Sequence, residues 1–411
     1  MLGTRIVRFM KATHRLALLS LVPVALAAQV TAPRQTDGDS YTRYELLAPG
    51  SGQFRITYEV TATAPRATHY FNAIRAGSIA TDESVFDRRT GSPLQFEEVG
   101  GAVARAGGVR SADTAGRYIR VRLNRPVPVD GEARLLIIKT YEDRVSYFAR
   151  GDTIIFTRPL GIKRNAVVLP GGYELVASNY PSQVLQEADG RIGVSFWNAT
   201  PVEAPLTIRA VPHRRTAVAA AASAVANRLS ERAHQDREII YFLQQPETHA
   251  FDLYHDYTES RPGTSTYLNV VRAGSTVANP RARDLDTGEE LRWETLKGDA
   301  ITRAGLDVSG VTPATEVVVF RFAPVLGGGS TRLRMYETYT DSARYRLVGD
   351  ELVWDRGFGR PLNIVVLPAG WILTNSSIPA TVSLREDGRV QLDFINARPD
   401  EIQVLITARR R

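Results

Sequence analysis

The chain has 411 residues, of which 43% are hydrophobic and 23% are charged. These fractions are typical of a globular protein and exclude an intrinsically disordered chain. The chain has no cysteine, which excludes disulfide bonds, catalytic thiolates and cysteine-ligated metal sites. Of the net charge of +7, four charges lie in the first 15 residues and the rest is a dispersed excess of arginine. No basic run is interleaved with aromatic residues, so we expect no nucleic-acid partner.

The first 28 residues have the pattern of a secretory signal peptide. Basic residues from Arg5 to Arg15 precede the apolar run 16–26, and the Ala-Leu-Ala at 25–27 offers a cleavage site. The apolar run is shorter than the roughly 20 residues that cross a bilayer. We therefore expect cleavage near residue 28, a periplasmic or extracellular protein, and no membrane span after cleavage. A retained N-terminal anchor is the alternative.

The rest of the chain contains one domain twice. Residues 161–210 recur 198 positions later, and the two segments align without a gap. Weaker matches extend the repeat toward the N-terminal side of both segments. We predict a first repeat at 41–212, a linker at 213–236 and a second repeat at 237–411. Each repeat is long enough to bury a hydrophobic core of its own.

Short strand patterns follow one another through each repeat. Residues 54–60 alternate apolar and polar at period two, as in a strand with one buried face. The stretch 98–116 is rich in Gly and Ala and matches the second repeat poorly, so we expect a surface loop there. Residues 165–169 are almost wholly apolar, as in a strand buried on both faces. Asp-Gly pairs at 189–190 and 387–388 predict equivalent hairpin turns.

Roughly ten short strands per repeat, without amphipathic helices between them, predict an all-β fold. We expect two tandem homologous antiparallel β-sandwich domains joined by an Ala-rich helical linker. Residues 216–232 place Val218, Val225 and Leu229 on one face at helical spacing, so we expect this helix to dock on one of the sandwiches.

Polar residues that recur at matching positions are the candidates for a shared site. Arg75 matches Arg272, and Arg158 matches Arg356. One interpretation is structural, because polar side chains inside a sandwich must be hydrogen-bonded. The other is a ligand groove in each repeat, where these arginines bind an anionic group through the bidentate guanidinium fork.

Aromatic residues near strand ends are candidates for stacking on sugars. Tyr173 and Trp371 occupy matching positions and form the best pair for such a binding role. Packing in the core is the alternative for both rings.

No motif in the sequence predicts a catalytic or metal centre. There is no His-Glu-x-x-His, P-loop or Gly-x-Ser-x-Gly pattern. Residues 284–290 begin like a calcium loop, but Arg89 stands where the first repeat would need its second carboxylate. We interpret both segments as solvated turns and predict no cofactor and no metal.

The duplicated segments carry a resemblance to uncharacterised exported bacterial proteins made of two such repeats. At the level of fold, the chain is similar to the N-terminal β domains of zinc aminopeptidases, although it has no zinc-binding helix. That resemblance implies a fold and no activity. We hypothesise an exported, non-enzymatic binding or structural protein whose partner is a protein or glycan of the cell envelope. The alternative is a hydrolase or carbohydrate-active enzyme with a site between the repeats.

Overall fold

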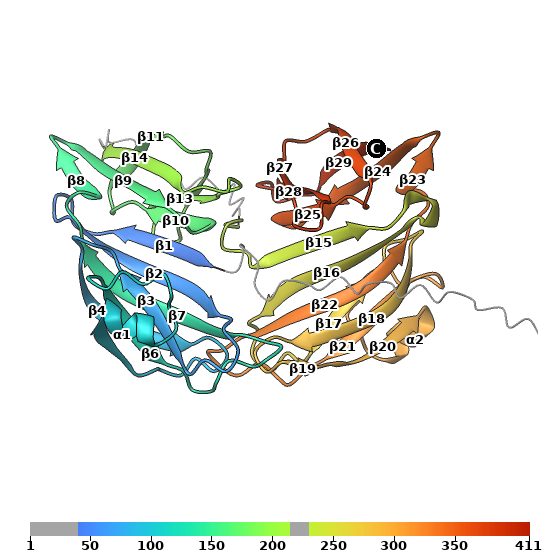
Figure 1. Cartoon of the computed structure of the whole chain (residues 1–411), viewed down its shortest axis with the longest axis horizontal. Coiled ribbons are helices and arrows are strands. Elements are labelled where there is room, and N and C mark those ends of the chain that lie inside the picture. Colours follow the sequence, from blue (N-terminus) through green and yellow to red (C-terminus); the bar gives the residue numbers. More distant parts are fainter. Residues whose placement is uncertain (1–39, 214–229) are drawn as a thin grey trace, which may run out of the picture. The chain divides into compact units, whose positions relative to one another are not determined.

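The computed structural model describes residues 40–213 and 230–411 (Figure 1). The predicted signal peptide and all but the last three residues of the predicted linker helix lie outside these ranges. Those three residues, 230–232, are not helical. The described residues form one compact unit. Among the described residues, no helix is long and apolar enough to cross a membrane.

The first repeat is built almost entirely from strands. In chain order its elements are β1 (Tyr41–Leu46), β2 (Gln53–Ala62), β3 (His69–Ile74), β4 (Ile79–Asp87), β5 (Phe96–Gly100), α1 (Gly101–Ala106), β6 (Arg117–Arg122), β7 (Ala133–Glu142), β8 (Tyr147–Arg150), β9 (Thr153–Leu160), β10 (Arg164–Val168), β11 (Tyr173–Ser178), β12 (Gln183–Gln186), β13 (Ile192–Trp197) and β14 (Ala204–Pro212). They form a seven-stranded sheet (β12-β13-β10-β1-β2-β7-β4), a three-stranded sheet (β3-β6-β5) and a four-stranded sheet (β11-β14-β9-β8).

The second repeat has the same order of sheets. Its elements are β15 (Arg237–Leu243), the 3₁₀ helix η1 (Pro246–Thr248), β16 (Ala250–Glu259), β17 (Thr266–Val270), β18 (Thr276–Asp284), β19 (Glu289–Glu290), β20 (Arg292–Lys297), α2 (Asp299–Arg303), β21 (Glu316–Arg321), β22 (Thr331–Thr340), β23 (Tyr345–Val348), β24 (Glu351–Phe358), β25 (Leu362–Val366), β26 (Trp371–Ser376), β27 (Thr381–Leu384), β28 (Val390–Ile395) and β29 (Ile402–Arg410). They form an eight-stranded sheet (β19-β18-β22-β16-β15-β25-β28-β27), a three-stranded sheet (β17-β21-β20) and a four-stranded sheet (β23-β24-β29-β26). No described sheet combines strands from both repeats.

Each repeat has its own hydrophobic core between its sheets. Alternate residues of the large sheets point inward, such as Phe54 and Ile56 on β2 and Phe251 and Leu253 on β16. The all-β sandwich prediction is therefore confirmed. One detail differs, because β1 pairs parallel with β10 and β15 pairs parallel with β25, while the other ladders are antiparallel.

The turn and buried-strand predictions hold in detail. β12 and β13 pair antiparallel around the Asp-Gly turn, and Gly190 has a φ of +85°. Gly388 has a φ of +78° in the equivalent turn of the second repeat. Strand β10, predicted to be covered on both faces, is buried along its whole length. A positive φ costs glycine little, which explains its place in both turns.

The Gly- and Ala-rich stretch 98–116 is more ordered than a surface loop. It contains the end of β5 and the short helix α1, which packs Ala104 against Tyr118 of β6. The second repeat has the helix α2 at the same place, with Ile301 packed against Val317 and Val319 of β21. Each helix covers part of the outer face of its three-stranded sheet (Figure 1).

Candidate functional site

Two of the arginines predicted to bind a ligand lie inside their repeats. Arg158 on β9 is 8% exposed, and its Nη1 donates to Asp143 Oδ2 over 3.1 Å. Arg356 on β24 is 7% exposed and approaches Asp341 Oδ2 at 3.5 Å. Burial works to raise the pKa of Asp143, but hydrogen bonds from Ser146 and the charge of Arg158 hold it below its usual value. These contacts support a structural role for Arg158 and Arg356. Ligand binding by these two arginines stays a prediction.

The other two predicted arginines lie nearer the surface, at the ends of β3 and β17. Arg75 is exposed, its backbone N–H donates to Tyr141 Oη over 3.3 Å, and no described carboxylate pairs with its guanidinium. Arg272 forms an ion pair with Glu401 at 3.3 Å. Since Arg75 is exposed while Arg158 is buried, the structure does not present the two as one open anion site.

The matching aromatic residues differ in exposure. Tyr173 at the start of β11 is half-buried, whereas Trp371 at the start of β26 is 2% exposed. The indole Nε1 of Trp371 donates to Gln245 Oε1 over 2.9 Å, and the Arg410 guanidinium lies 5.2 Å from its ring centre. The Trp371 ring is therefore buried, and sugar stacking at these positions stays a prediction.

The acidic turn that begins like a calcium loop is buried, so the prediction of a solvated turn is wrong there. Asp284 and Asp286 are 4% and 0% exposed. Arg134 donates to both carboxylate oxygens of Asp286 over 2.8 and 2.7 Å, and also to the side chain and backbone oxygens of Ser330. Arg89 donates to Asp284 over 2.9 Å. The negative charges of this turn in the second repeat are thus neutralised by arginines of the first repeat.

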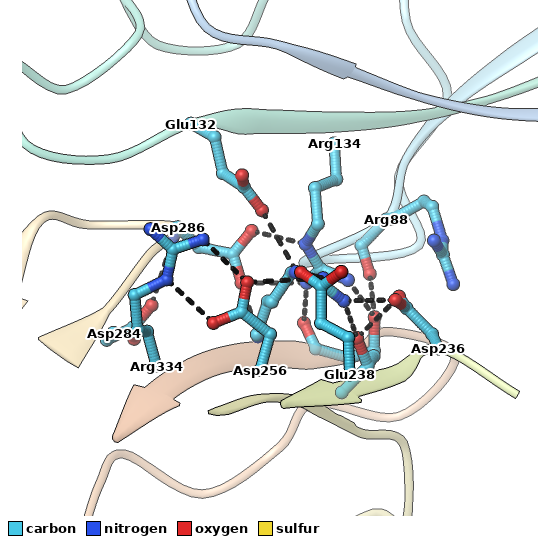
Figure 2. Close-up of polar contacts among 12 residues, drawn as sticks. Arg88, Glu132, Arg134, Asp236, Glu238, Asp256, Asp284, Asp286 and Arg334 are labelled. Atoms are coloured by element: carbon cyan, nitrogen blue, oxygen red, sulfur yellow. Dashed lines mark hydrogen bonds and ion pairs between the residues drawn. The ribbon is translucent and has the colours of Figure 1, made fainter. Parts of the chain in front are cut away.

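The same contact region contains a wider buried ionic cluster, drawn in Figure 2. Arg332 forms ion pairs with Asp236, with Asp256 at 3.6 Å and, across to the first repeat, with Glu132 at 3.6 Å. Arg334 binds Asp256 over 2.7 and 2.6 Å. Buried charges persist in proteins when they are paired in this way.

Ionised carboxylates balance the positive charge of the arginines in this cluster. Burial works to raise the pKa of Asp286, and the Arg134 guanidinium outweighs it, so the pKa lies below its usual value. For Asp256, burial likewise works to raise the pKa, and the charge of Arg334 outweighs it, so the pKa is also lowered. Among the described residues, no group of three His, Cys, Asp or Glu side chains could hold a metal ion. We interpret the cluster as the structural junction between the repeats.

An open groove in the first repeat is the strongest candidate binding site. It has a volume of about 1020 Å³ and lies between the start of β3, the start of β5, the end of β6 and the loop that follows β6. Its lining includes His69, Phe96, Arg120, Arg122 and Arg125. The Phe96 ring is 39% exposed although it belongs to a sandwich strand.

The groove exists because α1 covers only part of the outer face of the three-stranded sheet. Tyr118, Arg120 and Arg122 alternate along β6 and therefore share one face. Tyr118 packs beneath Ala104 of α1, and the two arginines extend beyond the helix. His69 pairs with Arg122 in the ladder between β3 and β6, which places the imidazole on the same uncovered face.

The second repeat provides an internal comparison for this face. The ladder of β6 with β3 and β5, set beside the ladder of β21 with β17 and β20, makes Arg122 equivalent to Arg321 and Arg120 equivalent to Val319. The first repeat therefore has an extra arginine, Arg120, where the second has Val319, whereas the second has Arg292 where the first has Gln95.

This extra cation changes the ion pairs. In the second repeat, Arg321 Nη2 donates to Glu294 Oε1 over 2.6 Å. In the first repeat, Arg120 takes the equivalent carboxylate of Glu97, with Nε to Oε1 at 3.0 Å. Arg122 is exposed and pairs with no carboxylate among the described residues. Its guanidinium is thus available to an anion in the groove.

Sequence reasoning missed Arg120 and Arg122. The signal that could have found them is the comparison of repeats, but the match is poor in this region, and a length change there hides which residues correspond. Only the strand ladders establish the equivalence.

Comparisons with known proteins give only distant structural matches. No family model and no curated protein matches the sequence. An M1 zinc metallopeptidase from Deinococcus radiodurans matches 42% of this chain and 41% of its own, with 14% identity and a TM-score of 0.26. An aminopeptidase N family protein from Idiomarina loihiensis matches 41% of this chain and 29% of its own, with 11% identity and a TM-score of 0.25. Collagen adhesin from S. aureus matches 76% of this chain and 81% of its own, with 7% identity and a TM-score of 0.17. This chain therefore spans less than half of the peptidases that it is similar to.

Proposed function

We propose that this protein is an exported, non-enzymatic binding protein that holds an anionic ligand in the groove of its first repeat. The observation that carries the proposal is Arg122, which is exposed in a large groove and has no carboxylate partner among the described residues, whereas its equivalent Arg321 is neutralised by Glu294. Export rests on the signal-peptide pattern of the first 28 residues. The hydrolase alternative stays a prediction.

The lining of the groove indicates the chemistry of the ligand. A guanidinium binds a planar carboxylate or a phosphate through two parallel hydrogen bonds. His69 adds a further donor at the same groove, and Arg125 adds positive charge there although its Nη2 lies 3.9 Å from Asp286 Oδ1. Phe96 pairs with Val121 in the ladder, so its side chain leaves the edge strand β5 on the face opposite to Arg122. Its ring is 39% exposed at the edge of the groove and offers an apolar platform on which the face of a sugar can stack. An acidic oligosaccharide of the cell envelope satisfies both requirements, since it combines carboxylates with apolar ring faces.

Calorimetric titration with a galacturonate oligosaccharide tests the proposal. The full chain should bind the oligosaccharide, and Arg122→Gln should weaken binding roughly tenfold or more, because a hydrogen bond to a charged group contributes about 1.5–3 kcal/mol. The matched control is Arg321→Gln, which removes the equivalent arginine of the second repeat and should leave binding unchanged. Phe96→Ala should also weaken binding.

Two further probes separate the possible sources of the charge. The methyl-esterified oligosaccharide keeps the rings but loses the carboxylates, and it should not bind. Inorganic phosphate should compete if the groove recognises any small anion, and should not compete if sugar rings are required. Equal binding of acid and ester, or equal losses in Arg122→Gln and Arg321→Gln, would contradict an anion site at this groove.

A further inference from the structure

The two repeats contact each other through the same pair of surfaces. Each repeat contributes the turn after strand β4 or β18, and the loop before its long strand, β7 or β22. The backbone N–H of Glu132 donates to the carbonyl of Leu285 over 2.7 Å, and that of Ser330 donates to the carbonyl of Arg88 over 2.8 Å. Glu132 and Ser330 are equivalent positions, and so are Arg88 and Leu285. The contact is therefore isologous, as in a two-fold dimer.

Glycines make this approach possible at both ends of the contact. A Cβ on Gly131 would lie 2.3 Å from the carbonyl oxygen of Leu285, and one on Gly329 would lie 2.1 Å from that of Arg89. Gly131 and Gly329 are also equivalent positions, and neither has a positive φ. Glycine is thus required at both for close backbone approach and not for its conformation.

The charges of this two-fold contact have diverged between the repeats. Arg134 of the first repeat binds Asp286 of the second, with both side chains almost fully buried. The two-fold equivalent of this pair would join Arg332 to Arg89, two like charges. Arg332 is paired with carboxylates instead, Glu132 among them. Two first repeats placed in the same contact would bring Arg134 against Arg89 twice, which is unfavourable for buried cations.

We infer that this junction is a heterospecific docking surface, on which the first repeat recognises the second repeat and rejects a copy of itself. Two backbone hydrogen bonds, two glycine contacts and the buried Arg134–Asp286 pair carry the recognition. A continuous chain through residues 214–229 is then not needed to hold the two halves together. The two repeats thus associate as the subunits of a heterodimer do, although they belong to one chain.

A cleavable linker tests this inference on the full chain. A protease site is introduced within residues 214–229, the folded protein is cut, and the product is followed by sedimentation velocity. The cut protein should sediment as one complex of both halves at about 1 μM. Two separately sedimenting halves, or complexes that contain two first halves, would overturn the inference.

Charge exchange tests the specificity. After cutting, Asp286→Arg should weaken association at least tenfold, and the double variant Asp286→Arg with Arg134→Asp should recover most of the loss. Gly329→Ala should also weaken association, while Gly327→Ala, whose Cβ would meet nothing within 4 Å, is the matched control. Near-UV circular dichroism of the uncut variants separates loss of docking from loss of fold. Folded variants that show no recovery in the double change would overturn the role of this pair.

Discussion

Equivalent positions of the two repeats carry opposite charges inside the cores. Lys139 on β7 donates to Asn72 Oδ1 over 2.5 Å, and Glu337 on β22 accepts from Asn269 Nδ2 over 2.7 Å. Both charged residues are almost fully buried. Burial lowers the pKa of Lys139 to about 8 and raises the pKa of Glu337 to about 7. The asparagine recurs because one amide can serve as acceptor in one core and donor in the other.

These two residues should give the protein opposite local pH dependences. The pKa of Glu337 in the folded protein lies above its ordinary value of 4.5. Its protonated form therefore contributes its full stability below pH 4.5, and this contribution is lost as the pH rises through about 7. Glu337→Gln should therefore raise the free energy of unfolding at pH 8 by about 3 kcal/mol, with little effect at pH 4. Urea denaturation at both pH values measures this change.

Lys139→Gln is the matched control for that experiment. The folded pKa of Lys139 lies below its ordinary 10.5, so its contribution is complete above pH 10.5 and is lost as the pH falls through about 8. The gain from Lys139→Gln should therefore grow toward low pH, opposite to the gain from Glu337→Gln. The same pH trend in both variants would show that burial of charge does not explain these pKa values.

The edge strand β4 and its equivalent β18, which pairs on its outer side only with the two-residue β19, share a β-bulge. The ladder to the neighbouring long strand shifts between Thr81 and Ser84 in the first repeat, and between Ala278 and Arg281 in the second. Within each bulge one residue has a positive φ, +55° at Asp82 and +51° at Asn279. Bulges twist an edge strand and limit its pairing with another chain.

The bulge residue should tolerate only side chains that accept this conformation. Asn279→Val should lower the free energy of unfolding by about 1–2 kcal/mol, since a left-handed conformation costs a bulky residue about that much. Asn279→Gly should not destabilise the protein, because glycine adopts a positive φ freely. Guanidinium denaturation of the two variants compares them. A loss in the glycine variant equal to that in the valine variant would mean that the amide, and not the backbone, matters.

At the scale of the whole molecule, the junction depends on ionised carboxylates. Glu59 lies 3.0 Å from Arg88, and although burial works to raise its pKa, the Arg88 charge lowers it to about 2. Asp236 and Asp286 are lowered in the same way by arginines of the cluster. A depressed folded pKa contributes stability above the unfolded value, and this stability is lost as the pH falls through the folded value.

Acid should therefore unfold the protein through this cluster. Thermal stability should fall steeply between about pH 4.5 and pH 2, where these carboxylates take up protons. Glu59→Gln should lower the free energy of unfolding at pH 7 by about 3 kcal/mol and flatten the acid limb by the same amount. Calorimetry across this pH range measures both effects. An acid limb unchanged in Glu59→Gln would exclude this carboxylate from the pH response.

Much of the architecture follows from local patterns. Period-two alternation at 54–60, the apolar run at 165–169 and the Asp-Gly turns each encode their element within a few residues, and the structure confirms all three. The recurring Arg158 and Arg356 were recognised as candidates, but their partners could not be named from spacing alone. An ion pair depends on which strands become neighbours and in what register.

Local sequence patterns therefore predict an all-β chain with a duplicated domain, because side-chain alternation and turn chemistry act over a few residues. Which charges are satisfied depends on contacts that exist only in the folded protein. Asp286 meets Arg134, 152 residues away, and is buried where the sequence indicated a solvated turn. Arg122 has no carboxylate partner within residues 40–213 and 230–411, because Glu97 lies opposite Arg120 in the ladder and pairs with it. Coulombic pairing acts through space and not along the chain, so the groove and the junction could appear only once the sheets were placed.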